Sequence, residues 1–444
     1  MHACPIRAAR RGTTHLRRVV PATVGGLAVL ALALVAAATA TAATWIVEAG
    51  CDPPNEDCDC SEIQPCIDMA APGDSVLVLG GTYAQQTTRT VDIDGSPVDI
   101  TASVFMRDGI HLIGAGPGAR AAARDPLAII DGGGAGIGIF ASGVSAGTLI
   151  ENLTIQNGRA NGPTGSWNSV GGGLLCVESS PTVRGNVFNA NDASGQGGGM
   201  YCELDSSPLV EQNLFVANRA GLEGGGFACF GGAPELRDNT FSTNTAENGA
   251  AVRYIGGGAI ADNTFTFNLA GVRQGDIELG PGLQTGPTVL IERNLFYSNS
   301  GALWVVTNPT TTLSQNTHVL GRTAIRSDAT TDAVEIFSNI IVSCEVAGVS
   351  IDPATVPNLS FQCNDVWDNE IDYDRLPDQT GMNSNISADP LHCNPSMIDF
   401  TLADNSPCTE NASPCGIQIG AFGAACPPSA IEATTWGAIK SSYR

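Results

Sequence analysis

Seven residues suited to holding or cleaving a sugar chain stand at matching places in a repetitive part of this sequence. Aromatic rings offer flat apolar faces to sugar rings, carboxylates accept hydrogen bonds from hydroxyl groups, and arginines donate them. We expect these residues to share one outward face as a candidate glycan-binding surface, and they are Tyr201, Glu203, Phe230, Arg253, Glu278, Trp304 and Arg326. The expected partner is a polysaccharide or another cell-surface component.

The same residues do not form an evident catalytic set. Acid–base cleavage of a glycosidic bond needs two carboxyl groups about 5–10 Å apart. Glu203 and Glu278 fall three repeats apart, or roughly 14 Å at the spacing of stacked strands. Arg253 or Arg326 is open as the base of a lyase, but neither has an evident acidic Ca²⁺ site beside it. The catalytic residues therefore stay unassigned.

No group of residues has the full spacing of a metal site. Cys58-Asp-Cys60 lacks a CxxC pair and a nearby histidine, which argues against zinc. Asp92-Ile-Asp-Gly95 is a loose Ca²⁺-like cluster, as are Asp372, Asp374 and Asp378, and neither matches a complete EF-hand loop. Solvated loops explain both clusters better than Ca²⁺ does, so we predict no resident metal or cofactor.

These candidates are positioned by a short phrase that the chain repeats nine times. An asparagine is followed two residues later by a bulky apolar residue, usually with a second asparagine five residues after the first. The phrase begins at Asn152, Asn186, Asn213, Asn239, Asn263 and Asn294, with looser copies at Asn316, Asn339 and Asn364. Successive copies start 22 to 34 residues apart. Such a period, without a helical heptad, predicts a β-solenoid of roughly eleven coils.

Alignment of the repeats predicts which side chains face inward. Gly171-Gly-Gly, Gly197-Gly-Gly and Gly224-Gly-Gly each precede a strand and predict corners. Alternation along the strands turns the glycan-binding candidates outward, although an error of one residue in a later repeat would reverse the assignment. The inward residues that begin these strands are Leu174, Met200, Phe227 and Val252. We expect the asparagines to form a corner ladder and the phenylalanines, with His318 at an equivalent place, to form a core column.

Both ends of the repeats carry sequences that suit caps. Ser61-Glu-Ile-Gln64 is a capping-box pattern, and Ile63, Ile67 and Ala70 recur at helical spacing. Pro72-Gly-Asp is expected to end this helix. The other end is rich in proline and cysteine and breaks the repeat.

Cysteine usage indicates an oxidising compartment. In an exported protein we expect the terminal cysteines to form disulfides, with pairings that the sequence leaves open. They are Cys51, Cys58, Cys60, Cys66, Cys344, Cys363, Cys393, Cys408, Cys415 and Cys426. Cys176, Cys202 and Cys229 stand at equivalent places in three repeats, which predicts a stack of small buried thiols.

Several segments resemble the right-handed parallel β-helix superfamily with the pectin-lyase-like fold. The run from Ile63 to Tyr83 is similar to the start of such proteins, and Asp389-Pro-Leu391, Asp399-Phe-Thr-Leu402 and Ile419-Gly-Ala-Phe422 are similar to their closing segment. The resemblance covers roughly residues 61–423 and implies an all-β, right-handed parallel β-helix with a short N-terminal capping helix and a Cys-rich C-terminal cap. It implies no single activity, because the superfamily includes lyases, hydrolases, epimerases and adhesins.

Composition and the leader indicate an exported bacterial protein. Basic residues up to Arg18 precede an apolar run of about 15 residues and an Ala-Thr-Ala cleavage option, as in a secretory signal. That run is shorter than a membrane span, so we expect a mature chain without one, secreted or at the cell surface, and monomeric. The 44 acidic residues outnumber 21 basic ones, which argues against nucleic-acid binding. Lys440 is the only lysine, so a lysine base is excluded from the coils.

The expected organisation is a signal peptide (1–43), an N-terminal cap with the first strand (44–80), a parallel β-helix (81–388), a C-terminal cap (389–428) and a tail (429–444). The tail is either a sorting or attachment segment, or a stretch that packs on the last coil or is disordered. Two functions remain open: a non-catalytic protein that binds glycans or surface partners, and a polysaccharide lyase or glycoside hydrolase acting on an acidic polysaccharide.

Overall fold

The computed structural model describes residues 42–52, 58–116, 127–273, 275–280, 288–301, 303–305, 310–328 and 333–428. The chain separates into Met1–Thr41 and Ala42–Arg444, and every described element belongs to the second unit. Residues 1–41 of the expected signal peptide and the whole expected tail, 429–444, lie outside the described residues.

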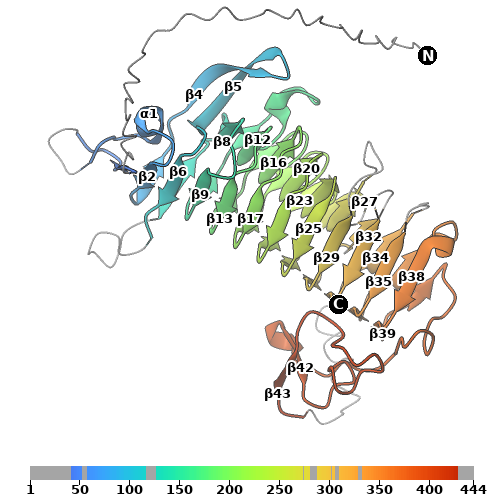
Figure 1. The fold of residues 1–444 in the computed structure, drawn as a ribbon. Helices are drawn as coiled ribbons and strands as arrows, with labels where there is room; N and C mark the ends of the chain where they lie inside the picture. Colours follow the sequence, from blue (N-terminus) through green and yellow to red (C-terminus); the bar gives the residue numbers. More distant parts are fainter. Residues whose placement is uncertain are drawn as a thin grey trace, which may run out of the picture. The chain divides into compact units, whose positions relative to one another are not determined.

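The second unit winds as a parallel β-helix in which successive coils add strands to three long sheets (Figure 1). Within the described residues these sheets hold 12, 11 and 12 strands, which agrees with the roughly eleven coils predicted from the repeats. A short five-stranded sheet follows the corner between the second and third sheets; its strands are β11 (Arg159–Ala160), β15 (Asp192–Ala193), β19 (Arg219–Ala220), β23 (Thr245–Asn248) and β27 (Leu269–Arg273).

The first sheet carries alternating charges on its outer side. Arg184 is in register with Glu151 on one neighbouring strand and with Glu211 on the other, at 2.7 and 3.7 Å. Such exposed pairs contribute little stability, about 0.2–1 kcal/mol each, but they favour this register. The strands are β1 (Thr44–Val47), β2 (Ser75–Val78), β6 (His111–Gly114), β9 (Leu149–Glu151), β13 (Thr182–Arg184), β17 (Leu209–Glu211), β21 (Glu235–Arg237), β25 (Gly258–Ala261), β29 (Val289–Glu292), β32 (Thr311–Ser314), β35 (Val334–Phe337) and β38 (Leu359–Gln362).

The second sheet carries the predicted column of inward rings. Phe188, Phe215, Phe241, Phe265 and Phe296 stack with centroids 4.6 to 5.1 Å apart. The ring of His318 continues the column 4.5 Å from Phe296, and burial lowers the pKa of His318 to about 3. This histidine is therefore a neutral core residue, as predicted. The strands are β3 (Gly81–Tyr83), β7 (Ala128–Asp131), β10 (Thr154–Gln156), β14 (Val187–Asn189), β18 (Leu214–Val216), β22 (Thr240–Ser242), β26 (Thr264–Thr266), β30 (Leu295–Tyr297), β33 (Thr317–Val319), β36 (Ile340–Val342) and β39 (Asp365–Trp367).

The third sheet begins with an antiparallel hairpin of β4 and β5 and continues with parallel strands. The strands are β4 (Thr87–Ile93), β5 (Ser96–Phe105), β8 (Ile137–Ser142), β12 (Leu174–Val177), β16 (Met200–Glu203), β20 (Phe227–Phe230), β24 (Val252–Ile255), β28 (Ile277–Leu279), β31 (Leu303–Val305), β34 (Thr323–Ser327), β37 (Ala347–Ile351) and β40 (Tyr373–Asp374). Asp94 and Gly95 form the hairpin turn, both at positive φ, so this loose Ca²⁺-like cluster is a two-residue turn. The sequence contained this Asp-Gly signal, but the hairpin was not predicted.

The asparagine ladder forms at the corner between the first and second sheets. Asn239 accepts hydrogen bonds from the backbone and side-chain nitrogens of Asn213, both at 3.0 Å. Its own Nδ2 donates to Val210 O at 2.8 Å and to Asn263 Oδ1 at 3.0 Å. The same pattern links Asn186, Asn213, Asn239, Asn263, Asn294, Asn316, Asn339, Asn364 and Asn385. A second ladder, at the next corner, links Asn191, Asn218, Asn244, Asn268 and Asn299.

The first predicted copy of the phrase was misaligned by one residue. The backbone nitrogen of Leu153, not Asn152, donates to Asn186 Oδ1, and Gly158 takes the corresponding place before Asn191. Asn152 is exposed at positive φ, on the turn just ahead of the ladder position. A short polar side chain tolerates that backbone conformation, which explains an asparagine there without any ladder role.

The N-terminal end is closed by helix α1 (Ile63–Met69). Ile63, Ile67 and Ala70 are buried as predicted. The predicted capping box does not form, because the helix begins after Glu62 without a side-chain cap. The Gln64 side chain instead bonds to the backbone nitrogen of Phe105 at 2.6 Å and to its oxygen at 3.2 Å, which ties the helix to β5.

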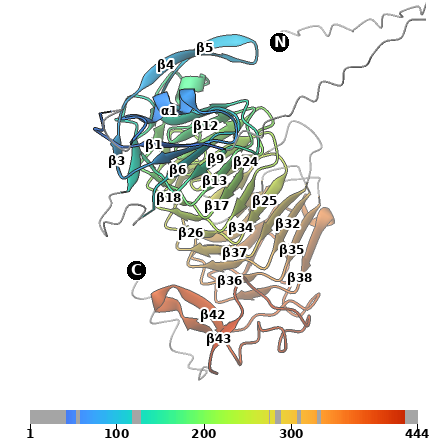
Figure 2. The same ribbon diagram turned by 60° about the vertical axis from the view of Figure 1, so that its left-hand side comes forward.

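The C-terminal cap packs on the outer side of the second sheet (Figures 1 and 2). Its strands are β41 (His392–Asn394), β42 (Asp399–Ala403) and β43 (Ala424–Cys426), and it also contains the 3-10 helix η3 (Pro395–Met397). Two other 3-10 helices, η1 (Trp167–Ser169) and η2 (Val356–Asn358), lie in the β-helix. Phe400, Leu402 and Ile419 form one apolar cluster with Tyr297 and Ile340 of the sheet.

Four disulfides join eight of the ten cysteines predicted to pair: Cys51–Cys58, Cys60–Cys66, Cys363–Cys415 and Cys393–Cys426. The prediction is wrong for Cys344 and Cys408, which are buried thiols on opposite sides of the second sheet. Cys344 faces the interior of the coil at a position of the second asparagine ladder, and its backbone nitrogen donates to Asn369 Oδ1 at 2.9 Å. Cys408 belongs to the cap and faces the outer side of the second sheet, where its thiol lies 3.1 Å from Asp365 Oδ2 of β39.

The three central cysteines stack in register inside the coil, as predicted. Cys176, Cys202 and Cys229 pair along β12, β16 and β20 and are fully buried. Burial raises the pKa of Cys202 and of Cys229, so both thiols stay protonated and inert. Among the described residues, no helix has the length and hydrophobicity to cross a membrane. The described residues also contain no group of three or more histidine, cysteine or carboxylate side chains that could hold a metal ion.

Loss of one ladder side chain should cost more than loss of an asparagine on a strand. Asn239→Ala leaves buried polar groups in two neighbouring coils without a hydrogen-bond partner. We therefore expect it to lower the free energy of unfolding by about 2–4 kcal/mol. Asn189→Ala, on the outer side of β14, is the matched control and should change it by less than about 0.5 kcal/mol. Urea unfolding followed by circular dichroism measures both, and equal effects would contradict the ladder's role.

Cap docking should make stability depend on pH through Asp365. Its carboxylate accepts a hydrogen bond from Ala388 N at 3.0 Å and contacts Cys408, and burial raises the pKa of Asp365 to about 7. The folded state therefore holds the proton more tightly, and stability falls as pH rises from about 4 to about 7, by at most ~4 kcal/mol. Asp365→Asn should flatten this part of the melting-temperature profile, whereas Asp404→Asn, at an exposed site, should not. An unchanged profile in Asp365→Asn would refute the assignment.

Candidate functional site

The third sheet aligns the candidate glycan-binding residues as the sequence predicts. From β16 to β34, the outward column runs through Tyr201, Ala228, Arg253, Glu278, Trp304 and Arg326. Glu203 and Phe230 form a parallel column two residues further along their strands. The uncertain register of the later repeats is thus resolved in favour of the predicted face.

The N-terminal half of this face is covered, so the expected open surface is wrong there. Outward residues such as Leu175 and Tyr201 belong to a second apolar cluster with Ile93, Ile100 and Phe105 of the β4–β5 hairpin. Tyr201 is only 5% exposed, and its hydroxyl donates to Glu203 Oε2 at 2.7 Å. Burial also raises the pKa of the Tyr201 hydroxyl above its usual value. The hairpin lies at the start of the sheet (Figure 2), where Asp99 O accepts a hydrogen bond from Asn168 Nδ2 at 3.0 Å; further along, the ring of Tyr201 packs against Phe230 with the centroids 5.7 Å apart.

Arg253 is enclosed by two carboxylates rather than presented to a ligand. It is 6% exposed, with Nε 3.3 Å from Glu223 Oε1 and Nη1 3.5 Å from Glu278 Oε1. Glu278 is itself buried. The guanidinium of Arg253 is thus engaged by two carboxylates and withdrawn from the surface, so the structure does not position it as a base toward a bound ligand.

Sequence reasoning missed Glu223, because it lies outside the strands, on the corner before Gly224. The only available signal was its position in the repeat. The backbone of Glu223 forms isolated parallel β-bridges with Gln196 and Asn248 in the two neighbouring coils. These three coils therefore each have a polar residue at this corner.

The face becomes open and charged in the coils of β34, β37 and β40. The side chain of Arg326 is 45% exposed, with Nη2 3.4 Å from Asp328 Oδ1. Trp304 precedes it in the column on β31, but the side chain of Trp304 lies outside the described part of the structure.

A second arginine lies just beyond β40. Arg375 Nη2 donates to Ser350 Oγ at 3.1 Å, and its Nη1 lies 3.5 Å from Asp352 Oδ2. Ser350 Oγ donates to Asp374 Oδ2 at 2.7 Å. We name Arg326, Asp328, Ser350, Asp352, Asp374 and Arg375 the charged strip. Apart from Arg326, its members were not among the predicted site residues.

The charged strip is suited to hydrogen bonding rather than to proton abstraction. Both guanidinium groups lie against carboxylates, which places N–H donors and carboxylate acceptors side by side. The third aspartate, Asp374, gives the strip three carboxylates against two guanidinium groups, so an anionic ligand gains no net attraction.

Removal of Arg253 should destabilise the protein rather than abolish an activity alone. Arg253→Leu leaves Glu223 and Glu278 without their shared cation, and we expect a loss of about 3–5 kcal/mol in unfolding free energy. Adding Glu278→Gln should restore part of that loss. Arg237→Leu, which breaks an exposed pair with Glu235, should cost less than about 1 kcal/mol. Chemical denaturation of the three variants measures their free energies of unfolding. An unchanged free energy of unfolding in Arg253→Leu would exclude a structural role for Arg253.

Comparison with known proteins gives a fold-level result. The family described as right handed beta helix region matches residues 96–270. The crystal structure of pectate lyase Pel9A is similar with a TM-score of 0.47 and 13% sequence identity, over 87% of this chain and 97% of that chain. No curated protein matches the sequence. The chain is therefore similar to the right-handed β-helix family over residues 96–270, and its fold is the predicted right-handed parallel β-helix.

Proposed function

We propose that this protein is an exported, non-catalytic β-helix that binds neutral glycans of a surface through the charged strip. The observation that carries the proposal is the change along one face of the third sheet. Its first coils are covered by the β4–β5 hairpin, whereas the coils of β34 to β40 present exposed arginine and aspartate side chains. A ligand as long as a glycan could lie across neighbouring coils there.

The chemistry of the strip favours hydroxyl groups as the ligand. A sugar hydroxyl both donates and accepts, so it can bond to a carboxylate and a guanidinium at the same time. Carboxylates outnumber arginines in the strip, and the whole chain has a formal net charge of −23. An acidic polysaccharide would therefore be repelled at long range, unless cations screen it.

The alternative is a lyase or hydrolase acting on an acidic polysaccharide. Its strongest base candidate, Arg253, is buried between Glu223 and Glu278. The exposed candidate, Arg326, is engaged in an ion pair with Asp328. Both findings favour binding over cleavage.

Export is supported by the oxidised cysteines. Four disulfides hold the two ends of the coil, and stable disulfides are typical of proteins outside the reducing cytosol. The leader sequence points the same way.

Glycan binding should depend on Arg375. We expect Arg375→Ala to weaken binding of a neutral polysaccharide, chosen from a panel of galactan, mannan, xylan and glucan, by about fivefold or more, because charge-assisted hydrogen bonds are lost. Affinity electrophoresis ranks the panel, and isothermal titration calorimetry measures the variants.

The control is Arg237→Ala, which removes an arginine from an exposed pair on the first sheet and should leave binding unchanged. Equal affinity of wild type and Arg375→Ala would exclude the charged strip. Release of unsaturated products from polygalacturonate with Ca²⁺, followed by ultraviolet absorbance, would instead support the lyase.

A further inference from the structure

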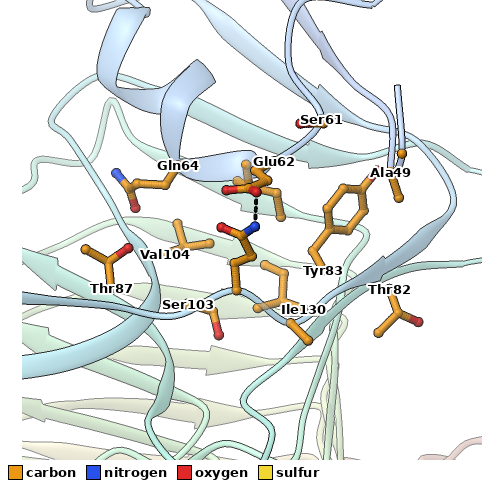
Figure 3. A pocket seen from close by; sticks show the side chains of 14 residues that line it. Ala49, Ser61, Glu62, Gln64, Thr82, Tyr83, Thr87, Ser103, Val104 and Ile130 are labelled. Atoms are coloured by element: carbon orange, nitrogen blue, oxygen red, sulfur yellow. Dashed lines mark hydrogen bonds between the residues drawn. The ribbon is translucent and has the colours of Figure 1, made fainter. Parts of the chain in front are cut away.

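A cavity of about 320 Å³ lies at the N-terminal end, far along the chain from the charged strip (Figure 3). It is bounded by the start of α1, the residues that follow β1, the segment from β3 to β4, and one end of β5. Its volume is at the small end of the range for small-molecule sites, which is about 300–1,000 Å³. One sugar ring is a ligand of suitable size.

The walls combine an apolar side with polar groups that have bonding capacity left. Val104 and Ile130 are buried core residues that line the cavity, and the ring of Tyr83 flanks them (Figure 3). Glu62 and Gln85 face each other across it, joined by a hydrogen bond from Gln85 Nε2 to Glu62 Oε1. That bond leaves the second oxygen of Glu62 and the amide oxygen and second N–H of Gln85 for a ligand.

A buried hydroxyl adds to this set. Ser103 is only 7% exposed and lines the cavity, but its Oγ makes one long hydrogen bond, 3.5 Å to Asp131 O. A buried hydroxyl with so weak a partner has capacity for a stronger one.

The walls are held in place before any ligand arrives. Tyr83 donates its hydroxyl hydrogen bond to the backbone, with Leu79 O at 3.0 Å and Val47 O at 3.2 Å, which fixes the ring. Gln64 ties α1 to Phe105 on β5, and the Cys60–Cys66 disulfide ties the same helix to the preceding chain. A preformed wall lowers the entropic cost of binding.

The charge of the cavity selects against acids. Glu62 is the one charged residue among the described residues that line it, and none of them is basic. A ligand carboxylate would meet a carboxylate with no compensating cation, whereas neutral hydroxyl groups meet acceptors and donors together.

We infer that this cavity is a second binding site, specific for a neutral pyranose unit, such as one sugar residue of a glycan. The apolar wall takes the C–H face of the ring, and Glu62, Gln85 and Ser103 bond to its hydroxyl groups. The site is separate from the charged strip and does not depend on the function proposed for it.

Saturation-transfer NMR and calorimetry with single sugars test this inference. The probes are glucose, galactose, xylose and N-acetylglucosamine, with glucuronate and galacturonate as the acidic counterparts. We expect at least one neutral sugar to bind about fivefold more tightly than its uronate at neutral pH. Glu62→Gln should narrow that difference to less than about twofold, because it removes the repulsion and keeps the shape.

Two further variants separate the cavity from other surfaces. Gln85→Ala should weaken the neutral sugar about fivefold, and Ala84→Trp, at an exposed alanine of the wall, should block binding. Glu235→Gln removes a carboxylate from the outer side of the first sheet and should leave the affinity for every sugar of the panel unchanged.

Three outcomes would overturn the inference: no sugar of the panel binds, the uronates bind as tightly as the neutral sugars, or Glu62→Gln leaves the difference intact. Loss of polysaccharide binding in Arg375→Ala with retained sugar binding here would support both sites independently. Circular dichroism confirms that each variant is folded.

Discussion

The buried corner between the first and second sheets sets the geometry of the whole coil. Backbone N–H and C=O groups at such a corner are removed from water and need partners, and the asparagine side chain supplies one acceptor and two donors. Asn239 accepts from Asn213 in one neighbouring coil and donates to Asn263 in the other, so each asparagine fixes two interfaces at once. A slip of one residue would break these bonds and turn the core side chains outward. Register, and with it every outward column, follows from this ladder.

The register of the outward columns alone does not decide which residues are accessible to a ligand. Burial of each side chain by neighbouring segments decides it. Register brings Arg253 beside Glu278 on the next strand, and burial converts this pair, with Glu223, into a structural group. The apolar cluster ends at Ala228 in this column, and Arg253 and Glu278 of the next strands are still buried. Arg326, by contrast, has an exposed side chain. A β-helix can therefore carry one continuous column of polar side chains and use only part of it for binding.

The features predicted from the sequence are those with short-range causes. Strand alternation, the ring column ending in His318 and the thiol stack all repeat within each coil, so one alignment predicts them. The failures depend on contacts between distant segments. The hairpin that shares an apolar cluster with Tyr201 precedes it by about a hundred residues, and the burial of Cys344 follows from its place at a corner of the coil. The error at Asn152 has a further cause, because Leu153 occupies the ladder position in the first coil and the nearest asparagine stands one residue earlier, on the turn.

Polar groups buried in the middle coils explain why the coils that carry the charged strip must be held by the C-terminal cap. Asp276 stands where the preceding coils have Ala251 and Gly226, and burial raises its pKa well above the usual range, with Asn268 the side chain that opposes the shift. Such groups lower local stability, and in a solenoid a coil gains support only from its neighbours. The coils after β31 have that support on their far side, because the Cys363–Cys415 disulfide and the Asp365–Cys408 contact join them to the cap. The cap therefore does more than close the core: it holds in register the coils that carry the exposed arginines and aspartates, so the surface proposed to bind glycans is ordered in advance.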